Sequence, residues 1–255
     1  MRTFKYLTSL LGFLTIYICQ VHAQDTIPIP LKIKIGIDVL GPATYYSNKN
    51  VLNTEAYISV DLDESKAVVV NVGSSNYKFS QYNYSYASSG KFIRFGMDFN
   101  LLKPDKSQGK YWFGIGLRYG LSSFNSEVPF FDKTGYWGTT VSSISSRKTL
   151  AQFVEISPGV RAEIFKNFSM GWSIGMRLLV SSGSGTDVRP IYLPGFGSAA
   201  KIITAGINYF LVWNIPFKTK IVILKKPAPE EPEDNNTENG NKANTGTNDG
   251  AIIRQ

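Results

Sequence analysis

Two neighbouring segments, Lys91–Lys103 and Lys110–Leu121, alternate between apolar residues and polar or small ones. Successive side chains of a β-strand point to opposite faces, so an alternation of this length predicts two strands. The residues between them, Pro104–Gly109, are of the types that form turns. The sequence therefore predicts a hairpin with one apolar face and one face of glycine and charge. What covers the apolar face decides the fold class.

The same period recurs in six further segments, which predicts eight strands in all. Their first apolar positions are Ile33, Ala56, Val68, Val154, Met170 and Ile203. We expect the strand around Val68–Val72 to be shorter than the others. Pro158 lies within the strand that begins at Val154, and it cannot donate a ladder hydrogen bond. We therefore expect a bulge or a poorly paired position there.

The connections between these strands alternate in length. Asp63–Lys66, Pro104–Gly109 and Lys166–Asn167 are short, whereas the others are longer, and the third long one runs from about Ser122 to Lys148. Short turns at one end and long loops at the other are typical of outer-membrane β-barrels. An even strand number also places both ends of the barrel domain on the side of the short turns.

The N-terminal residues 1–23 have the features of a secretory signal peptide. Arg2 and Lys5 precede the apolar run Leu7–Ile18, and Val21–Ala23 resembles a cleavage site. The chain's one cysteine and one histidine fall within this segment. We therefore expect a mature chain with no disulfide, no imidazole base and no thiol nucleophile. On this basis we expect neither an enzyme nor a cofactor or metal site.

A small water-soluble barrel would show the same alternation, with its apolar face inward. Glycine weakens a strand because it has no side chain to pack, so it is unfavourable on a water-facing surface. It is nevertheless frequent on the polar face here. Six such glycines are Gly96, Gly114, Gly116, Gly120, Gly171 and Gly175. A crowded lumen explains them better, so we expect lipid to cover the apolar face. The predicted fold is all-β: an eight-stranded antiparallel up-and-down transmembrane β-barrel over residues 24–224, with a disordered tail over residues 225–255. Lys218–Lys226 fits neither the alternation of the strands nor the composition of the tail, so we assign it no secondary structure.

The strands, short turns and long loops resemble the small outer-membrane β-barrel families of Gram-negative bacteria, of which OmpA-type barrels are the best known. The segment Thr204–Leu211 is similar to the assembly signal of such barrels, with a polar residue, a glycine and then aromatic and apolar positions. The resemblance covers Leu31–Phe217. It implies an outer-membrane location with the C-terminal tail in the periplasm.

The lumen of an eight-stranded barrel is just wide enough to be filled by side chains. The strand parity places six cationic and six anionic side chains inside, which predicts a neutralised structural network rather than an ion-selective pore. These residues are Lys32, Lys34, Arg94, Arg118, Arg161, Arg177, Asp38, Glu55, Asp61, Asp98, Glu155 and Glu163. We select Arg94, Asp98, Arg118, Glu155, Arg161 and Arg177 as the core of the network, with Glu155 and Arg177 as partners on neighbouring strands. The acidic Asp61–Glu64 stretch fits either a solvated turn or a calcium site.

These features favour a non-enzymatic outer-membrane protein that acts structurally or by presenting loops for binding. Two alternatives stay open: an accessory component of a secretion or envelope-assembly machine, and a narrow pore. The net charge of +8 suits the anionic head groups of outer-membrane lipid and lipopolysaccharide. A periplasmic protein is a further possible partner, through the tail at residues 225–255. Export argues against a nucleic-acid partner.

Overall fold

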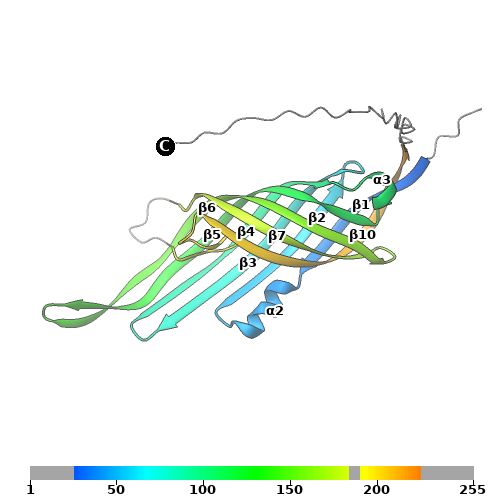
Figure 1. The fold of residues 1–255 in the computed structure, drawn as a ribbon. Helices are drawn as coiled ribbons and strands as arrows, with labels where there is room; N and C mark the ends of the chain where they lie inside the picture. The colour runs from blue at the N-terminus through cyan, green and yellow to red at the C-terminus, as the bar shows by residue number, and fades with distance from the viewer. Residues whose placement is uncertain (1–25, 184–189, 225–255) are drawn as a thin grey trace, which may run out of the picture. The chain divides into compact units, whose positions relative to one another are not determined.

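The computed structural model describes residues 26–183 and 190–224, and their strands form a closed antiparallel barrel (Figure 1). The expected signal peptide and tail lie outside these residues. The barrel strands are β1 (Thr26–Asp38), β2 (Val51–Asp61), β3 (Lys66–Gln81), β4 (Tyr84–Asn100), β5 (Tyr111–Gly135), β6 (Gly138–Phe165), β7 (Phe168–Ser181) and β10 (Ile203–Ile223). Each strand pairs with its neighbours along the chain, and β1 closes the ring by pairing with both β2 and β10. The predicted all-β fold with eight antiparallel strands is confirmed.

The alternation along each strand divides the barrel into an apolar outside and a polar inside. On β4 the outward Phe95 is 46% exposed, whereas the inward Arg94 and Asp98 are 1% and 2% exposed. Ile115 on β5 also faces outward. Exposed apolar side chains continue around the whole wall: Ile35, Ile58, Val72, Phe95, Ile115, Ile156, Ile174 and Ile207. We refer to this surface as the apolar belt. The prediction that the apolar face of the strands points outward is confirmed.

The predicted long loop from Ser122 to Lys148 is wrong. β5 and β6 continue through this region as a paired hairpin that reaches Gly135 and Gly138, visible in Figure 1 as the longest projection from the barrel. β3 is likewise not short: its 16 residues form a second long hairpin with β4. Both extensions are rich in Ser, Thr and Asn. Water can solvate both faces of such a ribbon, so the backbone ladder continues where the apolar period stops.

The unassigned segment at Lys218 forms the last part of β10, which pairs with the start of β1 as far as Thr26↔Ile223. The register shifts between Leu31 and Lys32, where β10 accommodates one extra residue. A shift of one residue exchanges the faces of a strand. On the N-terminal side of the shift, Ile29 and Leu31 are therefore the buried residues of β1. On its C-terminal side, the first buried residue is Lys32.

Pro158 is a poorly paired position, the second of the two predicted outcomes. It keeps its register partner Ile115 on β5. On the other side, the ladder with β7 stops at Ile156↔Met176 and resumes at Gly159↔Ser173 with no change of register. The strand thus tolerates the missing N–H group without a bulge.

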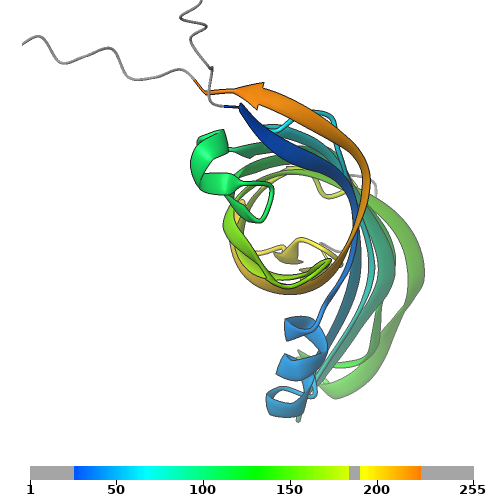
Figure 2. The same ribbon diagram turned by 90° about the vertical axis from the view of Figure 1, so that its right-hand side faces the viewer.

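Two short helices connect the strands. Figure 2 shows α2 (Leu40–Ser47) outside the ring of strands, and α3 (Pro104–Ser107) forms the turn between β4 and β5. The sequence alternation does not predict α2. The Asp38 carboxylate accepts hydrogen bonds from the Leu40 and Gly41 N–H groups and so fixes the start of this helix. Within the described part of the chain, neither helix has the length and apolar character needed to cross a bilayer.

The six inward glycines occupy positions where a side chain does not fit, as their crowding in the lumen predicts. A Cβ atom at Gly96 would overlap the carbonyl oxygen of Leu117 and lie 2.8 Å from Arg118 Cα. At Gly116 the Cβ atom would lie 2.5 Å from a carboxylate oxygen of Asp98, and at Gly175 it would lie 3.0 Å from one of Glu155. Glycine therefore makes room both for strand contact and for the charged side chains.

We predict that Gly96→Ala lowers the free energy of unfolding by about 1–3 kcal/mol, because the added methyl group meets rigid backbone. Gly135→Ala is the matched control, since its nearest atom would be 3.9 Å away. Urea unfolding followed by tryptophan fluorescence would measure both. Equal stability of the two variants would contradict the close approach of β4 and β5 at Gly96.

Candidate functional site

The centre of the lumen is organised by Glu155 on β6, whose side chain is 1% exposed. Its Oε1 atom accepts a hydrogen bond from Arg118 Nη1 at 3.0 Å, and its Oε2 atom accepts one from Arg177 Nε at 2.7 Å. Arg94 also pairs with Oε2. One carboxylate therefore binds three guanidinium groups, which come from β4, β5 and β7.

Two further carboxylates extend this network. Asp98 accepts a hydrogen bond from Arg118 Nη2 at 2.9 Å and forms an ion pair with Arg161 Nη2 at 3.6 Å. Glu55 pairs with Arg94. The structure thus brings together all six residues that the sequence selects, including the proposed pair Glu155 and Arg177.

Neutral residues that the sequence does not single out complete the network. Asn71 donates to Glu55 at 2.6 Å, and Tyr57 accepts a hydrogen bond from Arg161 at 2.7 Å. The Arg161 guanidinium also lies 5.0 Å from the centre of the Trp112 ring. All three residues have inward parity, and this parity is the one feature of the sequence that could have found them.

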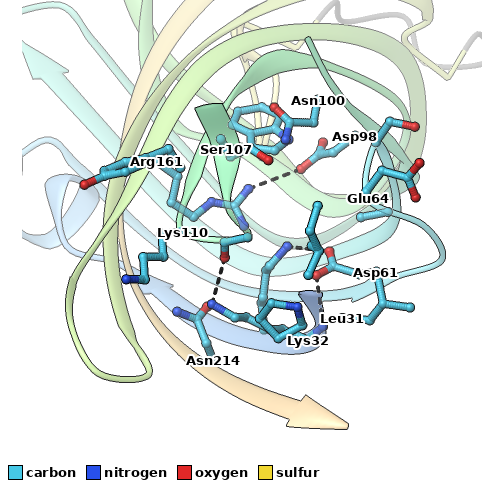
Figure 3. A pocket seen from close by; sticks show the side chains of 18 of the residues that line it. Leu31, Lys32, Asp61, Glu64, Asp98, Asn100, Ser107, Lys110, Arg161 and Asn214 are labelled. Carbon is cyan, nitrogen blue, oxygen red and sulfur yellow. Dashed lines mark hydrogen bonds and ion pairs between the residues drawn. The ribbon is translucent and has the colours of Figure 1, made fainter. Parts of the chain in front are cut away.

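A second layer of ion pairs lies toward the short-turn end of the barrel (Figure 3). Lys32 pairs with Glu163, and Lys34 pairs with Asp61. Lys32, Lys34 and Asp61 line a small cavity with a volume of about 50 Å³, which Figure 3 shows with Lys32 and Asp61 labelled. That volume accommodates a few water molecules at most. These ion pairs therefore occupy the end of the lumen near the short turns.

The acidic turn between β2 and β3 is neutralised by lysines. Asp61 pairs with Lys34, and Lys220 pairs with both Asp63 and Glu64. Hydrogen bonding with Glu64, and next with the Lys220 ammonium group, lowers the pKa of Asp63 to about 2. This arrangement supports a turn tied to β10, the first of the two interpretations of the acidic stretch.

The part of the chain from residue 190 to residue 199 lies inside the other end of the barrel, as the short strands in the interior of Figure 2 show. It contains the paired strands β8 (Tyr192–Leu193) and β9 (Gly197–Ser198). We call residues 190–199 the plug. Tyr192 stacks on Tyr77 with ring centroids 4.7 Å apart, and its hydroxyl group donates to Asn53 at 3.1 Å.

The plug is anchored by apolar contacts as well as polar ones. Leu193 and Phe196 are both 0% exposed and pack against Phe124, Ala151 and Phe153 from the barrel wall. From the sequence alone, this segment is expected only as part of one of the long loops. Its apolar residues stand between Pro and Gly, so no strand or helix period marks them as core.

The described residues contain no group of three or more His, Cys, Asp or Glu side chains positioned to hold a metal ion. The charged side chains at the centre are buried and paired with one another. Such an arrangement fixes the positions of the strands that carry it.

The chain is similar to one family of known sequences and to one known structure. A family model described as "Domain of unknown function (DUF6048)" matches residues 3–220. A search of curated proteins found no match. The crystal structure of CarO from Acinetobacter baumannii is similar with a TM-score of 0.35 and 12% identity, over 74% of this chain and 98% of CarO.

We predict that Glu155→Gln destabilises the barrel by about 3–5 kcal/mol, because it leaves buried guanidinium groups without a counter-charge. Urea titration of the purified protein would measure the change. Glu127→Gln is the matched control: it makes the same substitution at an exposed position of β5. A Glu155→Gln variant as stable as this control would contradict the structural role of the network.

Proposed function

We propose that this chain, which belongs to the DUF6048 family, is an outer-membrane barrel with a closed lumen that acts by binding, not by catalysis or conduction. The observation that carries the proposal is the apolar belt around the barrel. An apolar surface that encircles a protein drives association in water, whereas acyl chains cover it favourably.

The aromatic residues at one end of the belt support the same environment. Phe168 packs against Phe165 and against Trp213, with ring centroids 6.4 Å and 6.5 Å apart. Trp213 and Phe165 are more than half exposed. Aromatic side chains are enriched where a barrel wall meets the lipid head groups.

The orientation follows from the connections. The short turns and both ends of the barrel domain lie at one end, which we assign to the periplasm, and the long hairpins rise from the other. The OmpA-type architecture, the signal peptide at residues 1–23 and a periplasmic tail at residues 225–255 belong to this proposal.

The hairpins are the parts suited to binding. Tyr136 and Trp137 at the turn of the β5–β6 hairpin are 93% and 95% exposed, and Tyr82 at the turn of the β3–β4 hairpin is 98% exposed. Aromatic residues are enriched in protein interfaces. We propose lipopolysaccharide as the lipid that surrounds these hairpins and a protein or glycan as the partner at their tips.

The two alternative functions differ in how well they fit this geometry. An accessory role in envelope assembly is compatible with the β1–β10 ribbon, which carries the chain beyond the barrel at the proposed periplasmic end. A narrow pore fits less well, because the plug and two layers of ion pairs obstruct the lumen.

The belt is tested by Phe95→Arg, which places a charge among the acyl chains. A cation on the lipid face of a barrel costs about 2–4 kcal/mol at mid-membrane, so we predict a marked loss of folded protein in lipid vesicles. Tyr82→Arg is the control at an exposed turn, and we expect it to fold as the unmodified chain does. Cold gel electrophoresis of unheated samples separates folded from unfolded barrels. Equal folding of both variants would contradict a lipid-facing belt.

Planar bilayer recordings test the closed lumen. We expect no single-channel steps from the full chain, and none from Phe196→Ala, because the ion-pair layers remain below the plug. Reproducible conductance steps from the unmodified protein would overturn the closed lumen and support the narrow pore.

A further inference from the structure

The barrel wall has a lateral notch between β10 and β2. β1 pairs with β10 only from Phe210 onward and with β2 only over Ala56–Val60. The outer parts of both neighbours, Ile203–Tyr209 of β10 and Val51–Glu55 of β2, therefore have no β1 strand between them. The helix α2 contacts both strands but leaves a cavity of about 980 Å³.

The inner end of the notch is well defined. The Asp38 carboxylate accepts hydrogen bonds from the Tyr209 N–H group at 2.9 Å and from Asn208 Nδ2 at 3.2 Å. Asn208 Nδ2 also lies 3.4 Å from Glu55 Oε2, so it links both sides of the notch. The Asp38 carboxylate therefore has hydrogen-bond partners, and the Glu55 carboxylate has both Asn208 and Arg94 as partners.

The cationic groups of the cavity are less fully engaged. Arg177 uses Nε for Glu155, and its Nη2 atom lies 3.5 Å from Asn208 Oδ1. Arg177 Nη1 has no hydrogen-bond partner among the described residues, and Lys201, also on the cavity wall, makes no ion pair with any of them. The polar part of the cavity therefore has free capacity for an anion.

The edge of β10 offers further donors. Tyr209 directs its N–H and C=O groups toward Asp38 and Val39 of the β1 side. Backbone direction alternates along a strand, so Ile203, Ala205 and Ile207 direct their N–H groups the same way. These three residues have no strand partner on that side within the described chain.

Further walls of the cavity come from the plug, from the inward face of β4 and from the apolar belt. The cavity is also lined by Ile174, Ile203, Ala205 and Ile207, whose side chains face outward. It thus passes around the edge of β10 from the membrane surface to Arg177 in the lumen. A water-soluble anion would need only the polar half of this cavity, whereas a lipid would use both halves.

We propose that this notch, lined by β10, β2 and α2, binds a lipid with a phosphate head group that enters from the outer leaflet. Arg177, Lys201 and the free N–H groups of β10 hold the phosphate, and Ile174 and Ile207 contact the first part of an acyl chain. The proposal rests on the membrane location and orientation proposed above.

Native mass spectrometry of the full chain in detergent micelles tests this site. Dioleoyl phosphatidylglycerol, dioleoyl phosphatidylcholine and glycerol 3-phosphate are titrated separately. We expect phosphatidylglycerol to bind most tightly. Lys201→Glu weakens that binding about tenfold, the loss expected for one charge-assisted contact. Lys148→Glu is the matched control, an exposed residue of β6 away from the notch, and it binds as the unmodified chain does.

Each other outcome counts against the inference in a specific way. Equal binding of both lipids, or equal effects of the two lysine variants, overturns the lipid site while leaving the membrane barrel intact. Binding of glycerol 3-phosphate as tight as that of phosphatidylglycerol assigns the cavity to a soluble anion instead. A chain that stays monodisperse without detergent overturns the membrane location itself.

Discussion

We propose that the ion pairs around Glu155 set the register of the barrel. Arg118 and Arg177 are the direct register partners of Glu155 on β5 and β7, and Arg94 reaches the same carboxylate from β4. A slip of one residue would move every charge on a strand to the apolar face. A buried ion pair gives little net stability compared with apolar packing, but losing one partner is costly. The network therefore acts chiefly by making one pairing of β4 to β7 far better than any neighbouring one.

The side chains that fill the lumen change from charged to apolar along its length. Paired charges fill the part near the short turns and the centre, where glycines leave room for guanidinium groups. Toward the hairpins the filling becomes apolar, with Phe196 packed against Phe153 at a centroid distance of 5.7 Å. The notch beside β10 is the point where the wall, and not the lumen, gives access to Arg177. Access from the side and the proposed closure along the axis together favour a membrane-derived ligand over a transported solute.

The sequence determines the parts of this structure that depend on period alone. A period of two residues fixes which face each side chain takes, so the inward positions of Arg94 and Glu155 and the outward position of Phe95 are predictable. The long hairpins, α2 and the plug are not, because they depend on solvation, on a single capping contact at Asp38 and on long-range packing of Phe196. The register shift at Leu31 is equally unpredictable from β1, because the extra residue that causes it lies in β10.

The proposed membrane location requires that the outward face of the strands lies in acyl chains. Spin labels attached to single cysteines at Ile58, Ile115 and Ile174, with Tyr136 as the water-exposed reference, test it directly in lipid vesicles. The three wall positions should collide more with dissolved oxygen than with a water-soluble nickel chelate, and Tyr136 should show the reverse. Wall labels that respond to the nickel chelate as Tyr136 does would contradict the claim.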